Sequence, residues 1–205
     1  MIRDLRICFV GDSFVAGVGD PEHLGWTGRL AADSERAGLP LTRYVLGVRR
    51  QTSAEVAARW AAECTPRLAG GAWEPRVVLS VGVNDTAHED GVPRLAPDRS
   101  VAALTGMLDR AAAAGWPVLV VGPPPVADDA HTERTAALDD RFAQVCAEHA
   151  VPHVPVVGHL AGNPTWMREV AAGDGAHPGA AGYAALADLV RPHWTAWLAG
   201  RTPQR

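Results

Sequence analysis

The sequence predicts an α/β fold in three α/β/α layers, with one parallel sheet covered on both faces by helices. Short apolar runs alternate with longer segments of helical pattern along the whole chain, which is the order typical of βαβ units. The apolar runs are continuous, as in strands buried on both faces. The chain has 205 residues, of which 47% are hydrophobic and 20% charged, so it can bury a proper core. We therefore expect one domain over residues 1–205.

Five of the apolar runs are expected to be strands, which predicts a sheet of about five strands. The fifth run is interrupted by Pro152 and Pro155, and because proline cannot donate a ladder hydrogen bond, we expect it at an edge. Glycines close the other four, so the loops that follow them share one rim of the sheet, where ligands bind in such folds. The expected strands are 5–10, 41–47, 76–82, 117–122 and 151–157.

The helices are expected between and after these strands. Glu55 follows Thr52 at the spacing of a capping box, which predicts a helix beginning at Thr52 or Ser53. Gly38 and Pro40 end an earlier helix. The expected helices are 25–38, 53–64, 98–115, 132–150 and 179–199, with a bend at Pro192 and a short helix near Trp166. The expected loops are 65–75, 86–97, 123–131 and 158–173.

Composition excludes several classes of function. The net charge is −4 and no basic run is present, which argues against a nucleic-acid partner. All 19 basic residues are arginine, so a Schiff-base lysine, a Ser-Lys dyad and a phosphate-loop lysine are excluded. No apolar stretch approaches the length of a membrane span, and no signal peptide is evident. The cysteines at 8, 64 and 146 are widely spaced, which favours buried reduced thiols and a cytoplasmic location.

Reactive and polar residues gather on the predicted rim. Ser13 follows the first strand and Asn84 the third, while Asp174 precedes His177 by three residues. A serine needs a base within hydrogen-bond reach to become a nucleophile. One turn brings the Asp174 carboxylate to the Nδ1–H of His177 and leaves Nε2 to take the serine proton, the division of roles in a Ser-His-Asp triad. Asn84 can donate to the oxyanion of a tetrahedral intermediate.

Each of these residues also has a structural interpretation. Serine is a good helix cap, so Ser13 can simply begin the next helix. Asn84 and Asp85 are ordinary turn residues, and Asp174 and His177 can share a loop by chance. Joint placement on one rim favours the catalytic interpretation.

Three blocks of the sequence resemble those of the SGNH (GDSL-type) hydrolases. They are Gly-Asp-Ser at 11–13, Gly-Val-Asn-Asp at 82–85 and Asp-Gly-Ala-His-Pro at 174–178, in the order that the family has them. The resemblance extends from residue 6 to about residue 190. This family contains esterases, lipases, thioesterases and carbohydrate deacetylases, and its flavodoxin-like α/β/α fold agrees with the predicted one.

The resemblance implies a role for each matched residue. Ser13 would be the nucleophile, His177 the general base and Asp174 the acid that orients it. The oxyanion hole would include the Ser13 N–H and the Asn84 side chain. It implies no cofactor, and no three-residue ligand set with metal spacing is evident in the sequence.

The block after the second strand departs from the family pattern, which resembles Asn-x-Gly-x-x-Gly-x-Thr-Ser. Here Val45 replaces the asparagine and Arg50 stands where the second glycine donates its N–H to the oxyanion. If the backbone needs a positive φ, arginine is strained there. If φ is ordinary, the guanidinium stands at the pocket mouth and can pair with an anionic substrate. The second interpretation is favoured, with Asp85 or Glu89 as alternative partners within the protein.

We therefore expect a metal-free serine hydrolase that cleaves small ester or thioester substrates through an acyl-enzyme. One alternative is acyl transfer by the same residues to a small-molecule alcohol or amine. Another is a non-catalytic ligand-binding module that uses the loop at 11–19 for an anion. The sequence indicates neither the acyl group, the leaving group nor the oligomeric state.

Overall fold

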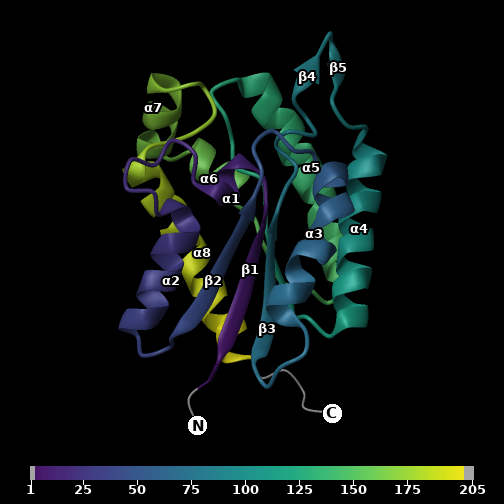
Figure 1. Ribbon diagram of the computed structural model, residues 1–205. Helices are drawn as coiled ribbons and strands as arrows, with labels where there is room; N and C mark the ends of the chain where they lie inside the picture. The colour runs from purple at the N-terminus through teal and green to yellow at the C-terminus, as the bar shows by residue number, and fades with distance from the viewer. Residues whose placement is uncertain (1–2, 201–205) are drawn as a thin grey trace.

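The computed structural model describes residues 3–200, which form a parallel five-stranded sheet between two layers of helices (Figure 1). The predicted α/β/α architecture is confirmed. The strand order is β2-β1-β3-β6-β7, so the chain crosses from one side of β1 to the other after β2. The strands are β1 (Leu5–Gly11), β2 (Leu41–Gly47), β3 (Glu74–Ser80), β6 (Val118–Val121) and β7 (His153–Val154). As predicted, the proline-flanked strand β7 lies at an edge.

The two helical layers enclose separate hydrophobic cores. On one face of the sheet lie α2 (Gly25–Arg36), α6 (Val157–Ala161), α7 (Pro164–Ala172) and α8 (Ala180–Ala199). On the other lie α3 (Ser53–Leu68), α4 (Pro97–Ala114) and α5 (Asp129–Glu148). Within residues 3–200, no helix combines the length and apolar character needed to cross a membrane.

Strand β1 shows why its sequence reads as a continuous apolar run. Ile7 and Phe9 enter the core beneath α2 and α8, whereas Cys8 and Val10 enter the core beneath α3 and α4. Successive side chains of a strand point to opposite faces. A strand covered on both sides therefore needs an apolar residue at every position.

Several boundaries differ from the predicted ones. Helix α3 continues four residues past Cys64, with Pro66 inside its last turn. The Trp73 ring N–H donates to the Leu68 carbonyl at 2.7 Å, which supplies a partner at the end of the helix, where carbonyls lack one. Strand β3 begins at Glu74, inside the predicted loop, because its N–H donates to the Asp4 carbonyl at 2.8 Å and continues the pairing with β1.

Two short elements of the rim were not predicted. Helix α1 (Ser13–Ala16) occupies a single turn directly after β1. Strands β4 (His88–Glu89) and β5 (Val92–Pro93) form a hairpin that extends beyond the carboxyl ends of the sheet strands (Figure 1). The hairpin turns through Asp90 and Gly91, both at positive φ. An Asp-Gly pair is a strong hairpin signal, and it could have revealed this element.

Candidate active site

Ser13 is held at the carboxyl rim by the turn between β1 and α1. It is the first residue of α1, and its side chain does not cap the helix; the Asp12 carboxylate does, accepting from the Phe14 N–H at 3.0 Å. Gly11, the last residue of β1, packs closely on β3, since a Cβ there would collide with the Ser80 carbonyl oxygen. Ser13 is only 5% exposed, and its Oγ lies 2.8 Å from His177 Nε2.

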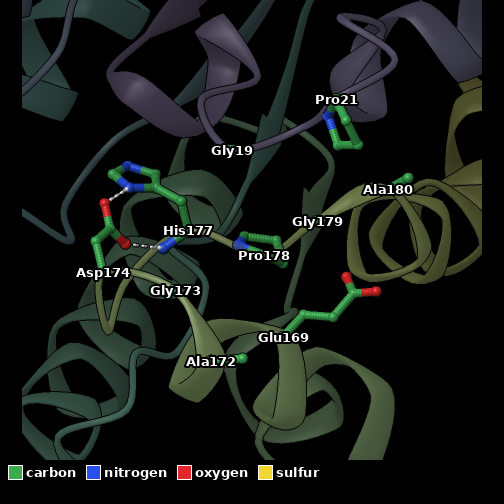
Figure 2. Close-up of a pocket in the computed structure, with 10 residues that line it drawn as sticks. All are labelled: Gly19, Pro21, Glu169, Ala172, Gly173, Asp174, His177, Pro178, Gly179 and Ala180. Atoms are coloured by element: carbon green, nitrogen blue, oxygen red, sulfur yellow. Dashed lines mark hydrogen bonds and ion pairs between the residues drawn. The ribbon is translucent and has the colours of Figure 1, made fainter.

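The segment from Asp174 to His177 folds back on itself in one tight turn. Asp174 Oδ1 accepts from the N–H groups of Ala176 and His177 at 3.0 and 2.9 Å. Its Oδ2 accepts from His177 Nδ1 at 2.7 Å (Figure 2). Gly175 adopts φ +81, a conformation that glycine reaches without strain. The three-residue spacing thus brings carboxylate and imidazole together as the sequence predicted.

The electrostatics of this turn favour an ionised carboxylate. Burial alone raises the pKa of Asp174, but hydrogen bonds from the His177 backbone and ring and from the Ala176 N–H outweigh it and lower the pKa to about 2. A carboxylate with this pKa stays charged through the neutral range. It accepts from Nδ1–H and thereby leaves Nε2 available toward Ser13 Oγ.

Phe14 supports the imidazole from the side. Its ring lies 5.0 Å from that of His177, centroid to centroid, and stacks on Trp166 at 6.2 Å. Phe14 and Trp166 are fully packed in the core. Because packed aromatic rings have little freedom, they restrict where the His177 ring can stand. Sequence reasoning did not identify these two residues, since nothing in their spacing relates them to residue 177.

Asn84 joins the loop after β3 to the loops after β1 and β2. Its Nδ2 donates to Asp12 Oδ2 at 3.0 Å and to the Gln51 carbonyl at 3.1 Å. An amide nitrogen carries two hydrogens, and both have acceptors here. An oxyanion at this site would therefore share or displace one of these bonds. The next residue, Asp85, anchors the same loop by accepting from the Ser53 N–H at 2.7 Å.

Asp12 is a buried acid that the sequence analysis left unassigned. Its burial raises the pKa to about 7, although the bonds from the Phe14 N–H and the Asn84 amide act in the opposite direction. The side chain therefore changes charge near neutral pH. It lies next to Ser13 in the chain and accepts a hydrogen bond from the proposed oxyanion donor Asn84.

Arg50 contradicts the interpretation that its sequence position favoured. Its φ is +66, a left-handed conformation that costs a non-glycine residue roughly 1–3 kcal/mol. Its guanidinium is not free at the pocket mouth, because it pairs with Glu89 at 3.1 Å. Asp85, the other candidate partner, is bound to Ser53 instead. The expectation of an ordinary φ is therefore wrong, and the guanidinium binds Glu89, one of the two alternative partners within the protein.

The backbone N–H of Arg50 has no acceptor within residues 3–200. The neighbouring carbonyl groups are both engaged: Arg50 O accepts from Arg94 at 2.8 Å, and Gln51 O accepts from Asn84. The unpartnered N–H is thus followed in the chain by two carbonyl groups that are each bound to a side chain.

A pocket of about 610 Å³ borders the turn that carries His177. Glu169 and Ala172 of α7 form one wall, and Pro21 stands opposite (Figure 2). The imidazole points toward Asp174 and away from Glu169 in this view. Glu169 accepts from the Gly182 N–H at 2.7 Å and so caps α8. Across the described residues 3–200, no group of three or more His, Cys, Asp or Glu side chains is arranged to hold a metal ion.

A serine, a histidine and an aspartate hydrogen-bonded in series at the rim of a parallel sheet are typical of hydrolases that act on acyl groups. The model of the GDSL-like lipase/acylhydrolase family matches residues 9–185. The chain belongs to this family, and it is a hydrolase that acts on ester bonds.

Solved structures of similar fold include several enzymes. TesA is similar at a TM-score of 0.77 and 24% identity, over 94% of this chain and 99% of its own. A lipase/acylhydrolase from Enterococcus faecalis gives 0.73 and 19%, over 98% and 100% of the two chains. Axe2, an acetylxylan esterase from Geobacillus stearothermophilus, gives 0.77 and 16%, over 94% and 95%. At these identities the likeness shows a shared fold. A search of curated proteins found no match.

Proposed function

We propose that the protein is a serine esterase that cleaves small ester or thioester substrates through an acyl-enzyme formed on Ser13. The observation that carries the proposal is the continuous chain of hydrogen bonds from Ser13 Oγ to His177 Nε2, at 2.8 Å, and from His177 Nδ1 to Asp174, at 2.7 Å. These distances are those of a nucleophile, its base and the group that orients the base.

In the acylation step, Ser13 Oγ attacks the acyl carbon while its proton passes to His177 Nε2. The new imidazolium is stabilised by Asp174, which stays ionised. When the tetrahedral intermediate collapses, His177 returns the proton to the leaving oxygen or sulfur. Water then repeats the sequence on the acyl-enzyme, with His177 again as base, and regenerates Ser13.

Three donors are proposed for the oxyanion: the N–H groups of Ser13 and Arg50 and the side-chain amide of Asn84. Asn84 Nδ2 bonds both Asp12, which precedes Ser13, and Gln51, which follows Arg50. The three donors are therefore tied into one unit around the nucleophile. Loss of a single donor of this kind lowers kcat by roughly 10²- to 10³-fold in known cases.

The experiment is turnover of p-nitrophenyl esters and acyl thioesters of graded acyl length by the wild-type protein and the Ser13→Ala and His177→Ala variants. We expect hydrolysis of at least one short acyl substrate, reduced by several orders of magnitude in both variants. Far-ultraviolet circular dichroism checks that the variants remain folded. Near-normal turnover by Ser13→Ala would refute the proposal, and the acyl length with the highest kcat/KM would define the substrate class.

A further inference from the structure

Arg94 connects the β4–β5 hairpin to the turn that contains Arg50. Its Nη1 donates to the Arg50 carbonyl oxygen at 2.8 Å, and its Nε pairs with Glu89 at 3.2 Å. Its own N–H donates to the Ala87 carbonyl at 2.9 Å, which closes the base of the hairpin. Glu89 also accepts from Arg50 Nη2 at 3.1 Å. The Glu89 carboxylate therefore binds both arginines. The carbonyl group and the guanidinium of Arg50 are both bound to the hairpin.

The segment from Val48 to Gln51 has the features of a type II turn. The Gln51 N–H lies 3.4 Å from the Val48 carbonyl oxygen, and φ is positive at Arg50 but not at Arg49. A type II turn favours glycine at this third position, whereas a type I turn has the same ends and accepts most residues there. The two turns differ by reversal of the central peptide, which carries the Arg50 N–H. The turn type therefore sets the direction of this N–H.

We propose that Arg94, acting with Glu89, is a positioning residue that keeps Arg50 left-handed and its N–H directed at the oxyanion. This inference rests on the proposed function. Arg94 binds the Arg50 carbonyl oxygen, and Glu89 binds the Arg50 guanidinium. The hairpin therefore binds this residue both at its carbonyl group and at its side chain, and the two contacts together restrain its backbone conformation. A glycine at this position would reach the same conformation without such support.

The surroundings of Arg94 suit this role better than direct binding of a substrate anion. Its side chain is 17% exposed, compared with 76% for Arg50. Besides Glu89, its positive charge acts on two further carboxyl groups. The pKa of Glu55 is lowered mainly by hydrogen bonds from Thr52, with a contribution from Arg94, and at Asp85 the Arg94 charge opposes the rise in pKa that burial causes. Acids of the protein therefore already balance the charge of the Arg94 guanidinium.

The first test measures kcat and KM separately on a neutral short-chain p-nitrophenyl ester. Arg94→Ala is expected to lower kcat roughly 10-fold, less than complete loss of an oxyanion donor. KM should change little, because the oxyanion forms only in the transition state. Arg94→Lys, which keeps a cationic donor, should recover part of kcat. Arg99→Ala, at an exposed arginine of α4, is the matched control and should behave like the wild type.

The second test repeats Arg94→Ala in the Arg50→Gly background, at a temperature where every variant is folded by calorimetry. Glycine tolerates a positive φ, so Arg94→Ala should cost several-fold less in kcat there than in the wild type. An equal loss in both backgrounds, or no loss in either, would overturn the role of Arg94. The Ser13→Ala variant separates the proposed function from the role of Arg94. If Ser13→Ala is inactive while the kcat of Arg94→Ala equals that of the wild type, only the role of Arg94 is overturned. An active Ser13→Ala variant would overturn the proposed function itself.

Discussion

Asp12 is the buried acid next to the proposed nucleophile, and its carboxylate links the loop after β1 to the loop after β3. Its carboxylate accepts from the Phe14 N–H and from the Asn84 amide, so it fixes both the turn that carries Ser13 and one proposed oxyanion donor. Full burial opposes its charge. The ionised carboxylate is the better acceptor for these two hydrogen bonds. Burial, however, favours the protonated form.

This conflict predicts a pH dependence of stability. The pKa of Asp12 is raised from 3.8 to about 7 in the folded protein, so folding favours the protonated form. The stabilisation is complete below about pH 4 and is lost as the pH rises through about 7, with a slope of at most roughly 1.4 kcal/mol per pH unit for one proton. Urea unfolding from pH 4 to 8 should show this decline in the wild type relative to Asp12→Asn. Parallel curves for the two proteins would contradict it.

The base at position 177 predicts a pH dependence of the rate. Acylation needs the neutral imidazole, so kcat/KM should rise with pH through an ionisation in the neutral range where histidine titrates. Asp174, with a pKa of about 2, stays charged throughout this range. Initial rates on a neutral ester measure the profile. A profile that is flat from about pH 5 to 9 would exclude a histidine base.

At the scale of elements, the contact between β2 and α1 sets the position of the nucleophile. Gly47 ends β2 against α1: a Cβ there would collide with the Ala16 nitrogen and lie 2.5 Å from the Asp12 carbonyl oxygen. Both atoms are backbone, so the clash cannot be relieved by a side-chain rotation. The end of β2 therefore packs directly against the backbone of Asp12 and Ala16, the residues on either side of the turn that carries Ser13.

Gly47→Ala is accordingly expected to lower both the midpoint of thermal unfolding and kcat/KM, because α1 must move away from β2. Gly106→Ala is the matched control. Gly106 lies within α4 with no heavy atom within 4 Å of an added Cβ, and the change should stabilise the protein by roughly 0.5–1 kcal/mol. Calorimetry and ester turnover measure both effects. Unchanged kcat/KM in Gly47→Ala would show that α1 tolerates the displacement.

The pairing of Arg50 with the hairpin also predicts how this arginine affects specificity. Because the guanidinium is bound to Glu89, Arg50→Gly should change kcat/KM by the same factor on matched neutral and anionic esters. Steady-state assays on the two substrates provide the comparison. A loss confined to the anionic ester would instead assign substrate recognition to Arg50.

The sequence predicted the elements that extend over several residues of apolar or helical pattern, and the turns that are local in the sequence. Doubly buried strands need apolar residues at each position, and the turn at 174–177 is local, so both could be derived without tertiary information. The hairpin at 88–93 and the single turn of α1 are too short to show a period. The φ of Arg50 and the contact between Asp12 and Asn84 depend on loops distant in the sequence, and sequence alone does not relate them.

At the scale of the whole molecule, the sheet separates two hydrophobic cores, and loops of the rim pack against both. The core beneath α2, α7 and α8 includes Phe14 and Trp166, which pack beside His177. The core beneath α3, α4 and α5 includes Val81 of the loop that leads to Asn84. Val83, the residue before Asn84, lies in the first of these cores, so the loop that carries the proposed amide donor contacts both.

The most direct test of the proposed mechanism is labelling with a fluorophosphonate, followed by peptide mapping by mass spectrometry. An activated serine attacks the phosphorus, while serines without a base react slowly. We expect one adduct, on Ser13, in the wild-type protein and none in Ser13→Ala. Labelling should be greatly slowed in His177→Ala. An adduct on another serine, or labelling of His177→Ala at the wild-type rate, would contradict the assignment of Ser13 and His177 as nucleophile and base.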